Sequence, residues 1–268
     1  MAWSTVHWRS DVLGKQTTMQ VLLPETGKAP YATFYLLHGL SDDSTMWLRR
    51  TRIEWYVRDL PLIVVMPDGY RGFYTDNDQG PAYARHIGEE LPSFVEKTFH
   101  AKAERGGRAI GGLSMGGFGA LRVGLGYADR FCSVNSHSGA VGWGSIEGDA
   151  GYWAEAKRRG WSDDFSAELK RVFGTSPMGS GHDLLTLAKS AKKARNLPKL
   201  LLDCGADDFL IEDNRKFQRE LTGAKIPHVY REFPGAHTWD YWDTHIQDAL
   251  QFHAKNLGLP GAGKQAQA

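Results

Sequence analysis

The feature that most constrains the fold is a glycine-rich segment, Ile110–Ala120, in which residues 112–116 read Gly-Leu-Ser-Met-Gly. This is the G-x-S-x-G pattern of a serine held on a sharp strand-to-helix turn. The backbone of such a serine is strained, so the residues two positions away on either side must lack side chains. An apolar run precedes the motif and a helical pattern follows it. The segment therefore predicts a strand, a turn that exposes Ser114, and a helix whose N-terminus points at that serine.

The rest of the chain alternates short apolar runs with longer amphipathic ones. Several apolar runs have no polar face, as expected for strands that are covered on both sides in a parallel sheet. Strands are predicted at Met19–Leu23, Thr33–Leu37, Leu62–Met66, Arg108–Gly111, Phe131–Asn135, Lys199–Cys204 and His228–Phe233. Helices are predicted at Thr45–Arg58, Ala82–Phe99, Met115–Tyr127, Asn214–Leu221 and Thr238–Asn256. This alternation predicts an α/β fold with a mostly parallel sheet.

One long interval interrupts this alternation and defines the domain organisation. About sixty residues separate the strand ending near Asn135 from the next strand, far more than a usual connection. The interval is rich in aromatic and charged residues, among them Trp143, Trp153, Trp161 and Phe165. Two structures fit this composition. One is a pair of surface helices, and the other is a cap folded over the strand ends, where open α/β sheets bind ligands. We predict a single domain over residues 1–257, a cap insertion at about 141–197, and a flexible tail over residues 258–268.

Composition excludes several classes of partner. Lys and Arg total 32 and Asp and Glu total 31, so the net charge of +1 provides no attraction for nucleic acid or an anionic membrane surface. No apolar run approaches the ~20 residues of a membrane span. Cys132 and Cys204 lie in apolar runs and are predicted to be free thiols, which favours a cytoplasmic location. No metal-ligand spacing or phosphate-binding loop occurs, so we expect no metal and no cofactor. Homo-oligomerisation stays open.

Ser114 needs a base, because a neutral hydroxyl is a weak nucleophile. His237 is the candidate, since it follows the last predicted strand and precedes a long helix, at the sheet edge where active sites lie. The acid that orients such a histidine precedes it in the chain. Asp208 is the preferred acid, because it stands three residues after Gly205 and suits a turn back toward the histidine. Asp207 remains an alternative.

Asp203 is a weaker candidate acid, because it lies inside the predicted strand. The tetrahedral intermediate also needs fixed hydrogen-bond donors for its oxyanion. The backbone N–H groups of Met115, which follows the nucleophile, and Leu40, which follows an early strand, are the candidates. His38 precedes Leu40 and is interpreted as a support for that loop.

Several of these segments together resemble an α/β-hydrolase family of esterases. The family includes S-formylglutathione hydrolases, tributyrin-type carboxylesterases, feruloyl esterases and mycolyltransferases. The resemblance covers about residues 15–255 and rests on residues 38–40, Trp47, residues 67–69, 112–117 and 205–210, and residues 234–242. It implies a triad of Ser114, Asp208 and His237, with oxyanion amides at Leu40 and Met115. We also predict that Trp47, from the same set, contacts substrate.

The tributyrin-esterase branch is the most similar, through Leu36–Arg52 and residues 208–214. S-formylglutathione hydrolases usually carry Thr-x-Thr after His-Gly-Leu and a proline in the acid loop. This chain has Ser-Asp-Asp at residues 41–43 and Asp-Phe at 208–209 instead, which argues against glutathione thioesters. His137 is unusual at its strand end and is a candidate for the border of the pocket.

The function that follows is a serine carboxylesterase that hydrolyses short-chain acyl esters of small molecules through an acyl-enzyme. An S-formylglutathione hydrolase-type thioesterase and an acyltransferase are the alternatives on the same fold. A non-catalytic binding protein is a third class, which the complete set of candidate residues disfavours.

Overall fold

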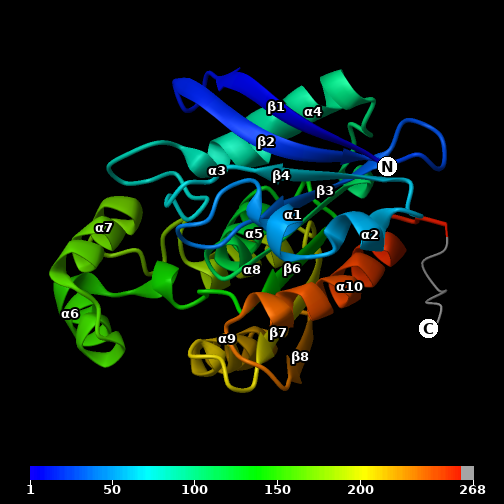
Figure 1. Cartoon of the computed structure of the whole chain (residues 1–268). Coiled ribbons are helices and arrows are strands. Elements are labelled where there is room, and N and C mark those ends of the chain that lie inside the picture. Colours follow the sequence, from blue (N-terminus) through cyan, green and yellow to red (C-terminus); the bar gives the residue numbers. More distant parts are fainter. Residues whose placement is uncertain (261–268) are drawn as a thin grey trace.

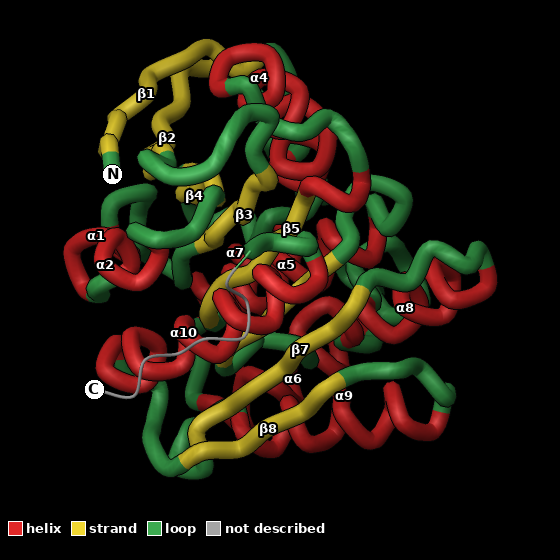
Figure 2. The backbone as a smooth tube through the Cα atoms, turned by 90° about the vertical axis from the view of Figure 1, so that its right-hand side faces the viewer, coloured by secondary structure: helices red, strands yellow, loops and turns green. Residues whose placement is uncertain are grey.

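An eight-stranded sheet forms the centre of the computed structural model, which describes residues 1–260 (Figure 1). The strand order is β1-β2-β4-β3-β5-β6-β7-β8, and Figure 2 shows the twist from one edge to the other. β1 pairs with β2 and β2 with β4 in antiparallel fashion, and every other pairing is parallel. The strands span Ala2–Ser10 (β1), Lys15–Leu23 (β2), Ala32–Leu37 (β3), Leu62–Pro67 (β4), Arg108–Leu113 (β5), Ser133–His137 (β6), Lys199–Gly205 (β7) and Val229–Phe233 (β8). The predicted α/β-hydrolase fold with a mostly parallel sheet is confirmed.

Helices cover both faces of this sheet. They span Met46–Arg50 (α1), Ile53–Val57 (α2), Tyr83–Arg85 (α3), Leu91–Phe99 (α4), Met115–Gly126 (α5), Gly148–Arg159 (α6), Asp163–Phe173 (α7), Leu184–Lys193 (α8), Ile211–Gly223 (α9) and Trp239–Asn256 (α10). In β3, Tyr35 and Leu37 face the core formed with α4, α5, α8 and α9. Phe34 and Leu36 face the second core, formed with α1, α2 and α10. Apolar side chains on both faces are the reason that this strand had no polar face in the sequence.

Some elements differ from the predicted ones. The predicted helix at 45–58 is two short helices, because the backbone N–H of Arg52 leaves the helical pattern and donates to Asp243 Oδ1 at 2.8 Å. The predicted helix at 82–99 contains α3, a π-helical turn at His86–Glu90, and α4. β1 was not predicted at all. It pairs with β2 alone, and most of its side chains are exposed or half-buried, so it carries little apolar signal.

The long interval between β6 and β7 forms an insertion of three helices. α6 and α7 project at one end of the molecule, on the left in Figure 1, and α8 returns to pack beside α5. Trp143, at the start of the insertion, stacks edge-on with Trp161 at 5.1 Å and with Phe165 at 5.8 Å between ring centres. Trp153 is exposed. The insertion is thus a helical projection anchored by aromatic packing around Trp143.

The packed chain extends slightly beyond the predicted domain end at residue 257. Leu259 is buried against the second core, and its backbone N–H donates to Ala254 O at 2.9 Å. Residues 261–268 of the predicted tail lie outside the described residues. Within residues 1–260, no helix combines the length and the apolar character needed to cross a bilayer.

Candidate active site

Ser114 lies on the sharp turn between β5 and α5, with backbone angles φ 53° and ψ −117°. A side chain at either flanking glycine would collide with backbone atoms. A Cβ on Gly116 would lie 2.5 Å from the carbonyl oxygens of Leu37 and His38, and one on Gly112 would lie 2.7 Å from Leu37 O. The glycines of the motif therefore allow β3, β5 and α5 to meet closely enough to hold the serine in its strained conformation.

His237 and Asp208 come from two loops at the same sheet edge, after β8 and β7 respectively. His237 Nε2 is 3.0 Å from Ser114 Oγ, and His237 Nδ1 is 2.8 Å and 3.0 Å from the two carboxylate oxygens of Asp208. The structure thus brings these three predicted residues into one hydrogen-bonded chain. The side chain of Asp207 is exposed, and only its backbone N–H is engaged, with Gly235 O at 2.9 Å.

The environment of Asp208 favours the charged carboxylate. Its side chain is buried, which raises its pKa, but the hydrogen bond and charge of His237 and the N–H of Leu210 outweigh burial. The net effect holds the pKa of Asp208 below its ordinary value. A carboxylate can only accept, so Nδ1 of His237 carries the proton and Nε2 presents its lone pair to the Ser114 hydroxyl. This is the tautomer that a general base requires.

The loop after β3 is held by buried hydrogen bonds. The N–H of Gly69 donates to His38 Nε2 at 2.9 Å, so this ring nitrogen carries no proton and Nδ1–H donates to Gly39 O at 2.8 Å. His38 is buried and supports the loop, as interpreted from the sequence. Leu40 and Met115 both line the pocket at Ser114. Met115 is the first residue of α5, so its N–H has no acceptor within the helix.

The pocket at Ser114 has a volume of about 330 Å³ and walls that are mainly aromatic and aliphatic. Its lining residues are Gly39, Leu40, Asp42, Phe73, Leu113, Ser114, Met115, Ala140, Trp143, Phe209, Leu210, His237, Trp239 and Trp242. The sequence had not singled out Phe73, Phe209, Trp239 or Trp242 as pocket residues. These four residues lie close in the sequence to residues 67–69, Asp208 or His237, and this proximity was the available signal that they line the pocket.

Trp47 does not line this pocket, contrary to prediction. It is 1% exposed, and its indole N–H donates to Leu37 O at 3.0 Å, at the end of β3. Its ring meets the edge of Trp239, which does line the pocket, at 5.4 Å. Trp47 therefore lies one layer behind the wall, where it supports the strand end and Trp239 instead of contacting substrate.

His137 does not border the pocket either. It is fully buried, its Nδ1 is 2.7 Å from Asp203 Oδ2, and its carbonyl oxygen accepts the N–H of Ser114 at 2.9 Å. Asp203 Oδ1 also accepts the hydroxyl of Tyr241 at 3.0 Å. Asp203 thus belongs to a buried His137–Asp203–Tyr241 network behind the candidate triad, which ties β6, β7 and the first turn of α10 together.

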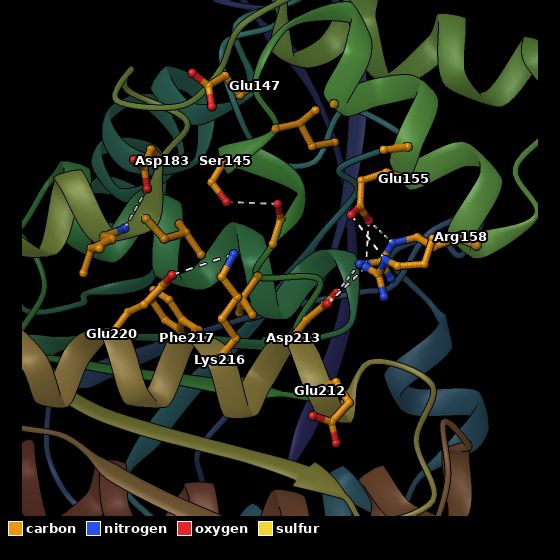
Figure 3. Close-up of a pocket in the computed structure, with 18 of the residues that line it drawn as sticks. Ser145, Glu147, Glu155, Arg158, Asp183, Glu212, Asp213, Lys216, Phe217 and Glu220 are labelled. Carbon is orange, nitrogen blue, oxygen red and sulfur yellow. Dashed lines mark hydrogen bonds and ion pairs between the residues drawn. The ribbon is translucent and has the colours of Figure 1, made fainter.

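A larger cavity of about 460 Å³ lies between α6, α8 and α9 (Figure 3). Its wall carries an ion-pair cluster in which Arg158 and Arg159 of α6 contact Glu155 and also Asp213 of α9. None of the three candidate catalytic residues lines it. This cavity is separate from the pocket at Ser114, and its paired charges link α6 to α9. Across the described residues, no three His, Cys, Asp or Glu side chains are grouped so that they could hold a metal ion.

Comparisons with known proteins agree with this fold. A family model described as "Putative esterase" matches residues 10–253. The chain is 32% identical over 269 residues to an acetyl esterase of Caldicellulosiruptor saccharolyticus, a match that covers 95% of this chain and 99% of that protein. The structure is similar to the substrate-bound fluorophosphonate-binding serine hydrolase F of Staphylococcus aureus, with a TM-score of 0.80, 30% identity, and coverage of 94% and 98% of the two chains.

It is also similar to an S-formylglutathione hydrolase of Staphylococcus aureus, with a TM-score of 0.79, 31% identity, and coverage of 94% of this chain and 98% of that chain. The family model extends over most of the sequence, and the relatives match nearly end to end. This chain therefore belongs to that family of carboxylic ester hydrolases and has its α/β-hydrolase fold.

Proposed function

We propose that this chain hydrolyses short-chain acyl esters of small molecules, with Ser114 as nucleophile, His237 as general base and acid, and Asp208 as the residue that orients His237. The observation that supports these roles most directly is the hydrogen-bonded chain from Ser114 Oγ through both ring nitrogens of His237 to Asp208. The backbone N–H groups of Leu40 and Met115 are the proposed oxyanion donors.

The proposed reaction has two halves. Ser114 Oγ attacks the ester carbonyl while His237 Nε2 takes the hydroxyl proton, and the tetrahedral oxyanion is held by the two amides. His237 then returns the proton to the departing alcohol, which leaves an acyl group on Ser114. A water molecule, deprotonated by His237, attacks the acyl-enzyme, and Ser114 regains its proton as the acid departs.

Pocket size and lining support a small, largely apolar acyl ester. A volume of about 330 Å³ is at the lower end of the range for small-molecule sites. Phe209 and Trp242 stand against the ring of His237, at 4.5 Å and 4.9 Å between ring centres, so apolar surface reaches directly to the proposed base. The similarity to a protein named acetyl esterase agrees with this acyl size.

A thioesterase is the second candidate, because one similar structure is an S-formylglutathione hydrolase. The same triad and oxyanion donors would serve a thioester, in which a thiol replaces the alcohol as leaving group. The two functions differ in the part of the substrate that leaves, and a direct comparison of rates separates them.

The experiment is a series of kcat/KM measurements on p-nitrophenyl acetate, butyrate, octanoate and palmitate, with S-formylglutathione alongside. We expect a maximum at acetate or butyrate and a weak thioester rate. A thioester rate far above every ester rate would establish the second candidate. Ser114→Ala should lose both turnover and labelling by a fluorophosphonate while keeping its melting temperature. Retained turnover would exclude Ser114 as the nucleophile.

We also propose a cytoplasmic location. It is supported by Cys132 and Cys204, which are free thiols at half-buried and buried positions. Fractionation of cells that express the complete native protein, with detection by antibody, tests this proposal. Recovery of the protein outside the cytoplasm would overturn it.

A further inference from the structure

The pocket at Ser114 contains one acidic side chain that the proposed chemistry does not use. Apart from His237, Asp42 is the single ionisable side chain among the described residues that line this pocket. The other walls are aromatic or aliphatic side chains and glycine backbone. A charge in an otherwise apolar pocket acts on any charged group that a substrate brings beside it.

The carboxylate of Asp42 is held over the loop that carries Leu40. Its Oδ2 accepts the N–H of Gly39 at 3.2 Å, and the N–H of Asp42 donates back to Gly39 O at 3.3 Å. A Cβ built on Gly39 would lie 3.0 Å from Asp42 Oδ2 and 3.8 Å from Ser114 Cβ. The carboxylate oxygen therefore lies within about 7 Å of the serine Cβ, inside the Debye length of about 8 Å at physiological ionic strength.

No neighbouring cation neutralises this charge by contact. Asp42 forms no ion pair with any described residue. The ring of His38 accepts the Gly69 N–H at Nε2 and is therefore neutral. Arg71 approaches the same loop, but its guanidinium is paired with Glu168 of α7. Asp43 and Arg50 are exposed at the surface, and burial raises the pKa of Asp42 above its ordinary value.

We propose that Asp42 determines the charge selectivity of the pocket: its carboxylate disfavours esters with a negative charge near the scissile bond and so selects neutral or cationic substrates. The inference rests on the proposed esterase function and narrows its substrate class. It gives a structural reason for the weak rate that we expect with glutathione thioesters, because the two carboxylates and one ammonium group of glutathione give that leaving group a net negative charge.

The test compares matched esters that differ by one negative charge. On the acyl side, the pair is mono-4-nitrophenyl succinate and its methyl ester. On the alcohol side, the pair is 3-acetoxybenzoate and its methyl ester. The selectivity of each pair is the ratio of kcat/KM for the anionic ester to kcat/KM for the neutral one, measured at pH 8, where carboxylates are ionised.

Asp42→Asn removes the charge but keeps an amide oxygen that can accept the Gly39 N–H. We expect it to raise the selectivity ratio about tenfold in at least one pair, the size expected for one partly shielded charge at this distance. Asp43→Asn is the matched control, because it removes the same charge one residue away, at an exposed position outside the pocket. We expect it to leave both ratios within twofold of the wild type.

The outcomes separate this inference from the proposed function. If the wild type turns over the neutral esters and Asp42→Asn changes neither ratio by more than twofold, the role of Asp42 is wrong and the esterase function stands. If Asp43→Asn raises the ratios equally, the effect belongs to overall surface charge and the inference is also wrong. If the wild type turns over no neutral ester, the proposed function itself fails.

Discussion

Replacing Asp208 with asparagine tests the geometry of the candidate triad. Asp208 Oδ1 accepts the N–H of Leu210 at 2.8 Å, and Oδ2 makes the shorter contact, 2.8 Å, to His237 Nδ1. In Asp208→Asn, the Leu210 N–H needs an acceptor, so the amide oxygen takes the Oδ1 position and the NH2 group faces His237. An NH2 group can only donate, so the proton of His237 moves to Nε2, which then cannot accept the Ser114 proton.

The expected loss in kcat/KM is about 10⁴-fold, or about 5.4 kcal/mol of transition-state stabilisation, which is the size measured when a triad acid is amidated. The assay is hydrolysis of p-nitrophenyl acetate at pH 8, with the melting temperature as a check on the fold. Asp207→Asn is the matched control, because its side chain is exposed, and it should stay within twofold of the wild type. Less than a tenfold loss in Asp208→Asn, or an equal loss in Asp207→Asn, would refute the tautomer argument.

Three further predictions concern stability. Gly116→Ala should lower the free energy of unfolding in urea by ~1–3 kcal/mol, because its Cβ would lie 2.5 Å from Leu37 O; an unchanged midpoint would contradict the close approach. Tyr241→Phe should cost ~1.5–3 kcal/mol in the same assay, because Asp203 loses a buried 3.0 Å hydrogen bond, and a loss below about 0.5 kcal/mol would count against the buried network. Burial raises the pKa of Glu90, but its hydrogen bonds outweigh burial and hold this pKa below 4.5 in the folded protein. The charged Glu90 carboxylate therefore stabilises the fold above pH 4.5, and this stabilisation is lost as the pH falls through the pKa of Glu90 in the folded protein. Glu90→Gln should therefore unfold with less pH dependence between pH 5 and 3 than the wild type, and an identical acid profile would exclude this contribution.

Short-range signals made most of the fold predictable, and they singled out the three residues that form the hydrogen-bonded chain at Ser114. β3 and β4 are buried along their whole length, so their apolar runs were unambiguous. Gly112 and Gly116 in the sequence indicated a close approach of two backbone segments, which a side chain at either position would block. Asp208 could be preferred over Asp207 because it lies three residues after Gly205 in the sequence. The N–H of Asp208 donates to Gly205 O at 3.1 Å, so the turn between these two residues is local.

Contacts between distant residues were not predictable from these patterns. His137 and Asp203 are 66 positions apart, and only the register of β6 beside β7 brings them together. Trp47 lies in a segment that was predicted to belong to the site, but its indole N–H donates to the carbonyl of Leu37 at the end of β3 and the ring does not line the pocket. β1 was missed because it has a single neighbour and its side chains are mostly exposed or only half-buried, so its apolar signal in the sequence is weak.

The sequence spacing of the three candidate catalytic residues has a consequence for synthesis of the chain. Ser114 and His237 lie 123 positions apart, and Asp208 lies between them, so the strained serine turn leaves the ribosome long before its partners. β5 can pair with β3 early, whereas β7, β8 and α10 must be added to an existing sheet edge. Long-range pairing of this kind forms late, because distant segments must first be brought together at an entropic cost. On the proposed roles, a nascent or C-terminally shortened chain lacks His237 and Asp208 and therefore has no base to activate Ser114. We expect such an incomplete molecule not to react with esters before it has folded.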